Sequence, residues 1–513
     1  MNPDLKVREF VYSLAIAILL VALAGGVAAL SLSFSIRATA AVLGALFCLF
    51  CAIASRNPRL FCLYGLGFSL PFLFAKTFGP VINKGGGEVA FNIDVSDIFL
   101  FILCLFIAKD IWSKRRHWLL VPKASYFWLT IMFFGLVTVV IGPYRTTAAQ
   151  EVSRMAKMLV LFIVLCQELS SPRRIVHWCS ALTSGLFVNA IVGLVQAHYR
   201  LTLGLADLGE PSADVTKTLA ATSLKGIEVW RPGAFLVHPN IFGIFLAVLI
   251  PLTIAGFLLR SGRMMRLWFL ISSILGMAAL VATESRSAWI SFCAALTLFL
   301  GLTLCHRRLR QRSTAATIAV IVLVIGVVAV EHETILRRIV DSQAEALEFR
   351  GVFNDDAKKM IADKPLWGFG LNSYALNVPL YSKYQYGSWP PPVHQIYYMW
   401  WAETGLIGLV LHLSMWGLLI WKGIGNLRVR DETLFAVNAA CLAGMLAFML
   451  DGFVSFSLRI TPTLKVFWAL SAMIMAIHYW RFRWEVPHKS FVMRTLPTPA
   501  FPDGLPLSAP LQS

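Results

Sequence analysis

The chain has 513 residues, of which 58% are hydrophobic and only 14% are charged. A soluble domain carries about 25% charged residues because its surface faces water. With a mean hydropathy of +0.71, the composition excludes a soluble multidomain protein and the disordered, collagen-like and disulfide-scaffold classes. A chain this apolar belongs in a lipid bilayer.

Apolar runs long enough to cross roughly 30 Å of hydrocarbon occur about fourteen times. We therefore expect an all-α polytopic membrane protein with about fourteen transmembrane helices. The expected spans are 10–33, 38–55, 60–79, 95–111, 124–143, 152–169, 176–199, 235–258, 266–283, 287–305, 314–330, 396–421, 433–455 and 463–480. Residues 1–480 would form the membrane domain, and 481–513 a Pro-rich cytoplasmic tail without fixed structure.

The basic residues of the loops predict the orientation of the chain. If the N-terminus is cytoplasmic, nearly every basic cluster falls on the cytoplasmic side, as the positive-inside rule requires. These clusters are Arg56/Arg59, Lys114-Arg115-Arg116, Arg173/Arg174, Arg260/Arg263/Arg266, Arg307/Arg308/Arg310/Arg312, Arg428/Arg430 and Arg481/Arg483. The net charge of +18 is therefore a topology signal and not a nucleic-acid footprint, and we expect both termini to be cytoplasmic.

Two outer segments are long, about 200–234 and 331–395. The second begins with apolar residues at helical spacing, which predicts two short amphipathic helices over 335–347 and 352–361, lying on the membrane face. The cysteines all lie in spans or at their inner ends, and none has zinc-ligand spacing. We therefore expect no disulfide framework and no metal site.

Polar residues gather at the outer ends of several spans. Arg231 and His238 precede the eighth span, and Pro232 and Pro239 disfavour a continuous helix through both. This pattern predicts a broken segment facing protein or a water-filled cleft, with an ordinary helix N-terminus after a prolyl turn as the alternative. Arg286 lies in a short turn at the outer interface, where an arginine needs an anionic partner. That partner is either Glu284 or a bound phosphate.

His394 stands where the chain re-enters the bilayer, and its imidazole suits proton transfer near neutral pH. A lone histidine is also commonly structural. The preceding loop is rich in aromatic residues, among them Trp367, Tyr374 and Trp389. These rings suit either stacking against sugars or anchoring at the interface.

Arg154 and Lys157 share a helical face within the sixth span. Basic residues at that depth, with few acids to pair with them, indicate a buried anion. A lipid diphosphate fits this description because it joins a charged head to an apolar tail.

Over about 230–410 the sequence resembles the O-antigen ligase and Wzy-type polymerase superfamily. The similarity lies in four motifs in order: Arg231 with Gly233 and His238-Pro239-Asn240; the Ser285-Arg286 turn; Pro365-Leu-Trp-Gly-Phe-Gly370 with Asn372; and His394 followed by Glu403-Thr-Gly405. Gln395 departs from the family, which often has Asn after the histidine. That substitution leaves the role of the amide open.

The resemblance implies a GT-C-type integral membrane glycosyltransferase working on the periplasmic face of the bacterial inner membrane. Its donor is a glycan on undecaprenyl diphosphate, and its acceptor is lipid A–core in ligases or another lipid-linked repeat unit in polymerases. Neither a metal nor a nucleotide sugar is implied. The residues expected to act in catalysis are His394, Arg286 and Arg231; those expected to bind substrate are His238, Asn240, Arg154, Lys157, Trp367, Asn372, Tyr374, Trp389, Gln395 and Glu403.

These residues predict direct, inverting displacement at the donor's anomeric carbon, with His394 as base and the arginines on the diphosphate. Ligase and polymerase remain alternatives. A flippase or other transporter of lipid-linked oligosaccharides is a second class. Transporters typically show paired repeats and midplane charges, whereas the polar residues here gather at the outer end and in one asymmetric loop.

Overall fold

The computed structural model describes residues 57–72, 74–82, 84–115, 119–205, 209–210, 222–224, 227–236, 238–259, 262–340, 344–383 and 392–485. The predicted spans 10–33 and 38–55 lie outside these residues, as does the tail from residue 486 onward. The N-terminal part of the tail, up to residue 485, is helical.

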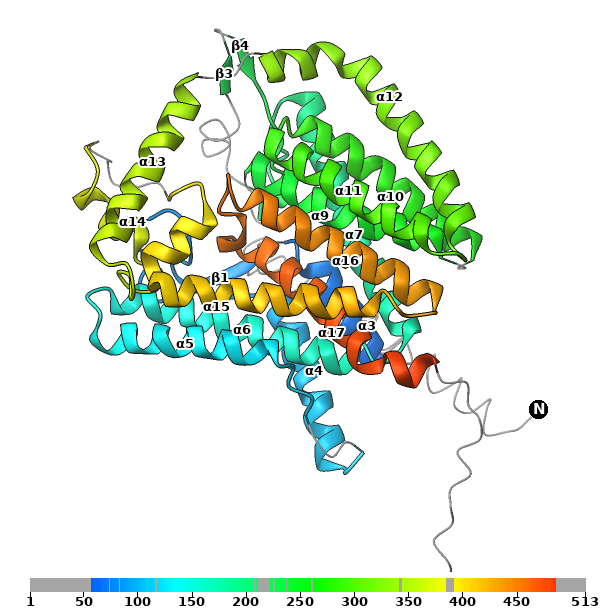
Figure 1. Ribbon diagram of the computed structural model, residues 1–513, viewed down its shortest axis with the longest axis horizontal. Helices are drawn as coiled ribbons and strands as arrows, with labels where there is room; N and C mark the ends of the chain where they lie inside the picture. The colour runs from blue at the N-terminus through cyan, green and yellow to red at the C-terminus, as the bar shows by residue number, and fades with distance from the viewer. Residues whose placement is uncertain are drawn as a thin grey trace, which may run out of the picture.

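The described residues form a predominantly helical molecule (Figure 1). The helices are α3 (Pro58–Ser69), α4 (Val95–Trp112), α5 (Ala124–Ile141), α6 (Arg145–Glu168), α7 (Pro172–Tyr199), α9 (Pro239–Leu258), α10 (Arg263–Ala282), α11 (Arg286–Cys305), α12 (Arg310–Val340), α13 (Ala344–Asp363), α14 (Tyr374–Asn377), α15 (Ile396–Asn426), α16 (Glu432–Asp451) and α17 (Thr461–Glu485), with the 3-10 turns η2 (Ala234–Leu236), η3 (Val378–Leu380) and η4 (Ser457–Arg459).

Among the described helices, seven are long and apolar enough to cross a membrane: α5, α7, α9, α10, α11, α15 and α16. The prediction of a polytopic helical membrane protein is confirmed at this level. Each predicted span from 60–79 to 463–480 coincides with a helix, but the third is wrong in extent. Helix α3 has 12 residues, about 18 Å at 1.5 Å per residue, and the chain turns at Pro71 because proline cannot continue a helix.

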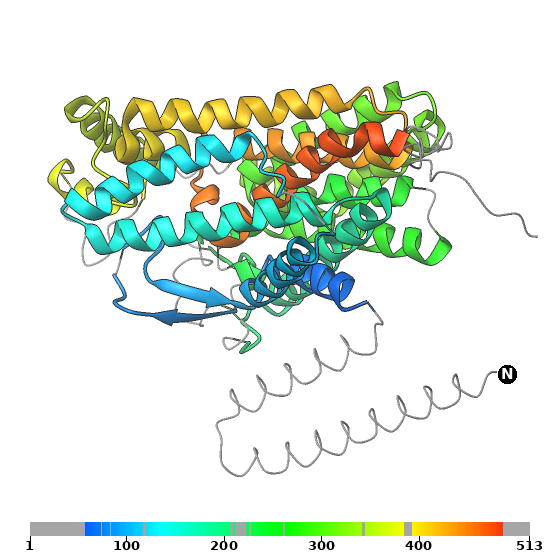
Figure 2. The same ribbon diagram turned by 90° about the horizontal axis from the view of Figure 1, so that it is seen from below.

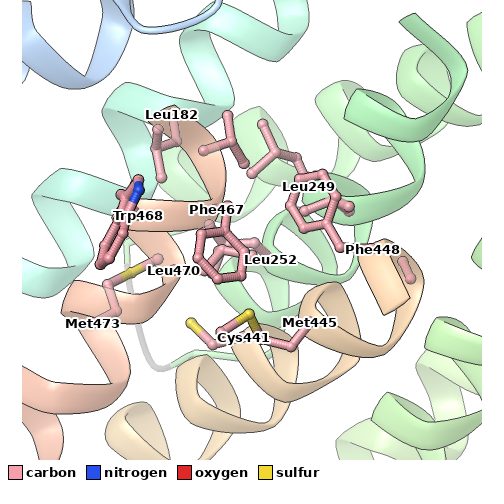
Figure 3. Packing of buried hydrophobic residues seen from close by; sticks show 14 of the residues in the cluster. Leu182, Leu249, Leu252, Cys441, Met445, Phe448, Phe467, Trp468, Leu470 and Met473 are labelled. Carbon is pink, nitrogen blue, oxygen red and sulfur yellow. The ribbon is translucent and has the colours of Figure 1, made fainter. Parts of the chain in front are cut away.

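The core lies around α9, which is apolar on every side and almost completely buried. Helices α7, α10, α11 and α16 pack against it. Toward α17 the core continues through large side chains; Figure 3 shows Phe448, Phe467 and Trp468 interdigitating with leucines and methionines from α7, α9 and α16. Burying such side chains removes apolar surface from water and fixes how the helices pack.

Ion pairs and hydrogen bonds join helix ends at the end of the bundle that carries the basic loops. Arg59 at the start of α3 binds Asp110 of α4 at 2.5 Å and Glu168 of α6 at 2.5 Å. Arg174 of α7 also binds Glu168, at 3.1 Å. Four helix ends that the loop charges assign to one side thus meet in the structure. We call this the basic end and the other the outer end.

The outer end carries the non-helical parts of the chain. Strands β1 (Ala75–Phe78) and β2 (Phe91–Asp94) form an antiparallel hairpin with Ala75 opposite Asp94, which Figure 2 shows beside α6, on the side away from α15. Strands β3 (Thr222–Leu224) and β4 (Ile227–Val229) pair in the loop before α9. The expectation that outer connections other than 200–234 and 331–395 are short was wrong, because the β1–β2 hairpin occupies the connection between α3 and α4.

The predicted loop 331–395 also differs from the structure. Helix α12 continues to Val340, about ten residues past the predicted end of the span, because residues 314–340 contain no proline and the one glycine is not at a helix end. Instead of two short amphipathic helices there is one, α13, of 20 residues. Its buried face includes Asp356, Ala357, Met360 and Ile361.

Candidate functional site

His394 lies in a cage of aromatic side chains at the outer end. Its ring stacks on Phe353 of α13, with centroids 5.8 Å apart, and meets the edge of Phe456 at 5.3 Å. Its Nδ1 is buried and has no hydrogen-bond partner among the described residues. Burial, followed by the positive charge of Arg350, lowers the pKa of His394 to about 4. The imidazole is therefore neutral at pH 7 and free to accept a proton.

Two arginines lie in the region of this histidine, Arg350 close enough for its charge to act on His394 and Arg286 close enough to act on Arg350. Arg286 is the first residue of α11, and Arg350 lies one helical turn before Phe353 on α13, so both α13 side chains share a face. Burial and the charge of Arg286 lower the pKa of Arg350, while Asp451 acts in the opposite direction. Within the described residues, neither guanidinium forms a hydrogen bond or an ion pair. Two half-buried like charges that are close enough to repel each other favour an anion between them.

Asp451 closes the site from the last residue of α16. It is fully buried and accepts a hydrogen bond from Ser457 Oγ at 2.6 Å. Its second oxygen, Oδ1, is buried with no hydrogen-bond partner among the described residues. The carboxylate offsets part of the positive charge of Arg350, but it is held by serine hydroxyls and not by a guanidinium.

Arg231 is buried, and its side chain is held by protein atoms. Its Nε donates to the carbonyl of Thr283 at 2.8 Å, and its Nη2 donates to Asn240 Oδ1 at 2.7 Å. Thr283 precedes the turn that carries Arg286. Arg231 therefore ties the start of α9 to that turn. The segment before α9 is broken by η2, and α9 itself begins at Pro239 as an ordinary capped helix, so both alternatives for residues 231–240 describe part of it.

His238 caps α9, since its Nδ1 accepts the backbone N–H of Asn240 at 3.0 Å. Burial, followed by the charges of Arg231, His394 and Arg350, lowers the pKa of His238 to about 3. His238 and His394 are thus close enough to influence each other. The structure brings Arg231, His238, Asn240, Arg286 and His394 into one region, although they come from three separate segments.

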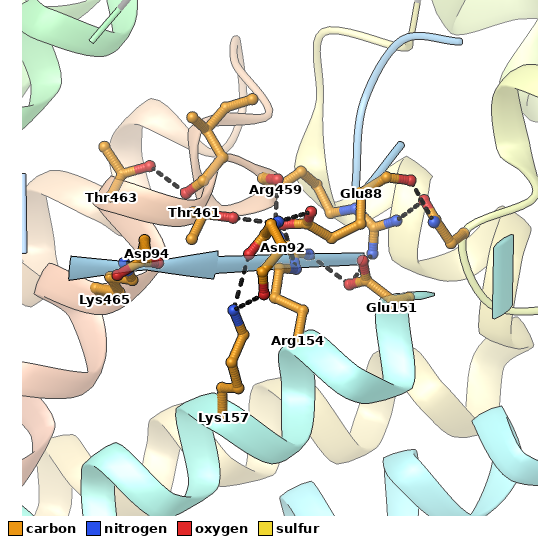
Figure 4. Close-up of polar contacts among 12 residues, drawn as sticks. Glu88, Asn92, Asp94, Glu151, Arg154, Lys157, Arg459, Thr461, Thr463 and Lys465 are labelled. Atoms are coloured by element: carbon orange, nitrogen blue, oxygen red, sulfur yellow. Dashed lines mark hydrogen bonds and ion pairs between the residues drawn. The ribbon is translucent and has the colours of Figure 1, made fainter. Parts of the chain in front are cut away.

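A second set of polar residues is completely buried nearby. Figure 4 shows Glu88, Glu151, Arg154 and Arg459 converging from the β1–β2 hairpin, α6 and η4. Arg154 donates to Glu151 and to the Arg459 carbonyl, the latter at 2.6 Å. Arg459 pairs with Glu151 at 3.1 Å. The set is completed by Lys84, Asn372, Glu403 and Thr461, and we call these eight residues the buried network.

The buried network corrects one premise of the sequence analysis. Arg154 and Lys157 were expected to lack acidic partners, and that was wrong. Arg154 pairs with Glu151, and Lys157 Nζ lies 2.9 Å from Asp97 Oδ2. Lys465 likewise pairs with Asp94 at 2.6 Å. Asp94 and Asp97 were missed because they lie at the end of β2 and the start of α4, far from the cations in the sequence. Glu151 lies only three residues before Arg154 and could have been recognised as its partner. The arrangement favours a structural role for Arg154 and Lys157, and their binding of substrate stays a prediction.

Glu403 and Asn372 belong to the same network. Glu403 Oε2 lies 3.2 Å from Arg459 Nη2, and Glu403 Oε1 accepts the N–H of Tyr374 at 3.2 Å. Asn372 Oδ1 accepts from Lys84 Nζ at 2.6 Å. Burial, followed by the charge of Arg459, lowers the pKa of Lys84 to about 8. Both predicted binding residues are fully buried and engaged by protein groups, although Glu403 Oε2 has an ion pair and no hydrogen bond among the described residues.

The remaining predicted residues are dispersed. Tyr374 is buried, and its hydroxyl donates to the Phe353 carbonyl at 3.4 Å, next to the histidine cage. Trp367 is 65% exposed and lies against Phe134 of α5, with ring centroids 5.9 Å apart. Gln395 has a buried Oε1 without a hydrogen bond among the described residues. Trp389 lies outside the described residues. Tyr374 and Gln395 therefore lie near the cage. Trp367 instead lies on the surface of the molecule, against α5.

Sequence reasoning missed Arg350, Asp451 and the two phenylalanines of the cage. Arg350 had a detectable signal: it lies just before the helix predicted over 352–361, three residues before Phe353 and seven before Ala357, in line with the apolar face of that helix. A cation on such a face is unusual in itself. Asp451 also had a signal, because it lies inside the predicted span 433–455, where an acidic residue is costly and commonly functional. In the part of the chain that the structure describes, no group of three His, Cys, Asp or Glu side chains could hold a metal ion.

A comparison with known protein families gives one match. Residues 270–413 match the model of the family described as O-antigen ligase. The matched segment runs from α10 to the middle of α15 and so includes Arg286, Arg350 and His394. A search of curated proteins found no match.

Proposed function

We propose that this chain, which belongs to the O-antigen ligase family through residues 270–413, transfers a glycan from undecaprenyl diphosphate to an acceptor hydroxyl. Family membership carries the general activity, a glycosyltransferase-like step of polysaccharide biosynthesis in a membrane. In this proposal the whole chain has about fourteen transmembrane helices in a GT-C-type arrangement. The site would open to the periplasm of a bacterial inner membrane, with both termini cytoplasmic.

The observation that carries the proposal is that Arg350 lies close enough to both Arg286 and His394 for the charges to interact. Two guanidinium groups without protein partners among the described residues lie beside a neutral imidazole whose Nδ1 is free in the same sense. A diphosphate ester is the anion that suits paired guanidinium forks. An acceptor hydroxyl is the group whose proton suits the imidazole.

The proposed reaction is a single displacement. His394 takes the proton of the acceptor hydroxyl as its oxygen bonds to the anomeric carbon. The bond from that carbon to the diphosphate oxygen breaks, and its electron pair leaves with the diphosphate. Arg286 and Arg350 stabilise the charge that grows on the leaving group. One displacement inverts the anomeric centre.

Arg231 takes a different part in this proposal from the one its sequence suggested. Because its donors are engaged by the Thr283 carbonyl and Asn240, we assign it to holding the turn that presents Arg286. Arg350 replaces it as the second phosphate ligand. His238, held near both charges, would line the floor of the same site.

Complementation tests the assignments. In a strain lacking the gene, we expect His394→Ala and Arg286→Ala to abolish the surface or secreted glycan that the wild-type gene restores. Lys358→Ala, an exposed residue of α13 paired only with Asp355, serves as the control and should complement fully. Normal glycan in both site variants, at normal protein levels in the membrane, would refute the assignments.

The same strain separates ligase from polymerase. A cell lacking a polymerase retains single repeat units on its surface. A cell lacking a ligase loses all attachment of the glycan to lipid A–core. Both outcomes are compatible with the site, since the acceptor differs and the displacement does not.

A further inference from the structure

Glu403 occupies a point where three segments of the outer end meet. It lies in α15, two residues before Gly405, whose φ of 67° and ψ of −174° interrupt the helix. Its backbone carbonyl accepts the N–H of Gly370 at 2.9 Å, and its Oε1 accepts the N–H of Tyr374 at 3.2 Å. Across the break, Leu406 N–H donates to the Pro365 carbonyl at 2.8 Å. The segment 365–374 is thereby fastened along both sides of the break.

This segment leads directly to one wall of the histidine cage. It follows α13, with the N–H of Gly368 donating to the Lys364 carbonyl at 3.1 Å. At its far end the Tyr374 hydroxyl donates to the carbonyl of Phe353 at 3.4 Å. Phe353 stacks on His394. Any movement of segment 365–374 relative to Glu403 therefore moves the helix that carries Phe353 and Arg350.

The carboxylate of Glu403 is connected, through Arg459, to Phe456, the second aromatic wall of the cage. Its Oε2 pairs with Arg459 Nη2 at 3.2 Å. Arg459 belongs to η4, and its N–H donates to the carbonyl of Phe456 at 2.8 Å. Phe456 meets the ring of His394 edge-on. The Glu403–Arg459 pair thus joins the two walls between which the imidazole is held.

A third contact reaches the segment of His394 itself. The tip of the β1–β2 hairpin carries three consecutive glycines, and a Cβ at Gly86 would overlap Pro392, two residues before the histidine. At Gly87 a Cβ would overlap Asn372 Oδ1. Lys84 anchors this tip by donating to Asn372 Oδ1 at 2.6 Å. Glu88 accepts from Thr461 Oγ1 at 2.5 Å.

The charges of the buried network balance. Its cations are Lys84, Arg154 and Arg459, and its anions are Glu88, Glu151 and Glu403. Burying ion pairs gives little net stability, and apolar residues of similar volume often serve stability equally well. What such a network provides is a single arrangement of the segments it joins, because any displacement leaves a buried charge without its partner.

We propose that the Glu403–Arg459 pair is a positioning device that sets the distance between the two walls of the His394 cage. The inference rests on the proposed function, in which His394 is the base. Glu403 and Arg459 touch no substrate in this account. They act through Phe353, Phe456 and Pro392, which fix the orientation of the imidazole and exclude water from it.

The test compares Glu403→Gln with Asp94→Asn in the full-length protein in lipid nanodiscs. Both substitutions turn a buried carboxylate into an amide of the same shape, and Asp94 is paired with Lys465 at 2.6 Å. Asp94 has no contact with the cage, and asparagine keeps its capping role on α4. We expect Glu403→Gln to lower kcat by about 10- to 100-fold through misorientation, with donor KM changed by less than about threefold. For Asp94→Asn we expect wild-type kcat per folded molecule.

The pH dependence of kcat/KM is a second measurement, and a loss of stability alone would not change it. Around His394 the charged or titratable groups are Arg350 on α13, which interacts with Arg286 and Asp451, and His238 before α9. Burial is the main cause of its lowered pKa. A loosened cage admits water, so Glu403→Gln should shift the acid limb of kcat/KM upward, toward the ordinary histidine value. Asp94→Asn should leave it in place.

If Glu403→Gln does not fold, a second variant tests the same positioning role. Arg459→Lys keeps the charge, but one ammonium group cannot serve Glu151, Glu403 and Asn372 together. It should give an intermediate kcat and an intermediate acid limb. If Glu403→Gln or Arg459→Lys matches Asp94→Asn in both readouts, the positioning role is wrong. If His394→Ala retains full activity, it is the proposed function that fails.

Discussion

His394 shows how position changes the chemistry of a residue that the sequence marks only by type. In water its imidazole would be half protonated at about pH 6.5. Between Phe353 and Phe456, and near Arg350, the pKa falls to about 4. Because only the neutral form accepts a proton, the lowered pKa keeps the base competent over the whole neutral range.

The lowered pKa of His394 determines how kcat/KM should depend on pH. Protonation removes the base, so kcat/KM should be level between about pH 5.5 and 8 and should decline only as pH falls toward the lowered pKa. Substituting Arg350→Gln removes one of the two causes of the shift, so its acid limb should move to higher pH even though its rate is lower. Steady-state kinetics in a mixed buffer of constant ionic strength would measure both. An acid limb centred at pH 6.5 or above in the wild type would contradict the cage.

Arg286 and Arg350 show what sequence reasoning could and could not provide. Arg286 was predicted because a short turn holds it at the outer interface, where an arginine needs an anionic partner. Arg350 lies between the two helices predicted over 335–347 and 352–361, and its approach to Arg286 depends on how α13 packs in the folded protein. Local sequence patterns carry no information on that approach.

Among the elements, α15 depends most on one residue. Gly405 has a φ of 67°, and a Cβ there would overlap the Leu366 carbonyl. The break lets the Pro365 carbonyl accept the N–H of Leu406 at 2.8 Å, so segment 365–374 docks against the helix. The hydropathy pattern predicted one uninterrupted span over 396–421, since glycine within an apolar run gives no sign of whether the helix continues through it.

Gly405→Ala should therefore lower stability by about 2 kcal/mol or more, because an L-residue is strained at this backbone conformation and its Cβ meets backbone atoms. Gly417→Ala in the same helix is the matched control, since a Cβ at Gly417 meets nothing within 4 Å. That change should raise stability slightly, by about 0.5–1 kcal/mol, as alanine favours a helix. Thermal unfolding in detergent would compare them. Equal midpoints for the two variants would exclude a structural need for the break.

At the scale of the whole molecule, hydropathy and loop charge predicted where most of the long helices lie and which of their ends share one side. The helices from α4 onward fall where the apolar runs indicated. The ends assigned to one side meet in the structure through Arg59, Arg174 and Glu168. These features could be predicted because a bilayer imposes length and sidedness on each span independently of the others.

The buried network could not be predicted in the same way. Arg459 lies 308 residues from Glu151 and 56 from Glu403 in the sequence. Cations at depth were recognised as unusual, but Glu88 and Asp94 come from a hairpin that no strong pattern marks. Glu151 in α6 pairs with Arg459 only through the tertiary fold. Attributing all of the basic residues to a bound anion was therefore too broad. The structure separates the paired cations from Arg286 and Arg350.

Turnover by the purified protein is the most direct test of the central proposal, that Arg286, Arg350 and His394 form one metal-independent transfer site. Wild-type protein in nanodiscs, given a glycan on undecaprenyl diphosphate and a defined acceptor in the presence of a chelator, should release undecaprenyl diphosphate and form an inverted linkage. His394→Ala should lose at least about 100-fold in kcat, and Arg350→Gln should weaken the donor interaction. Unchanged turnover in these variants, or turnover that requires an added divalent metal, would contradict the proposal.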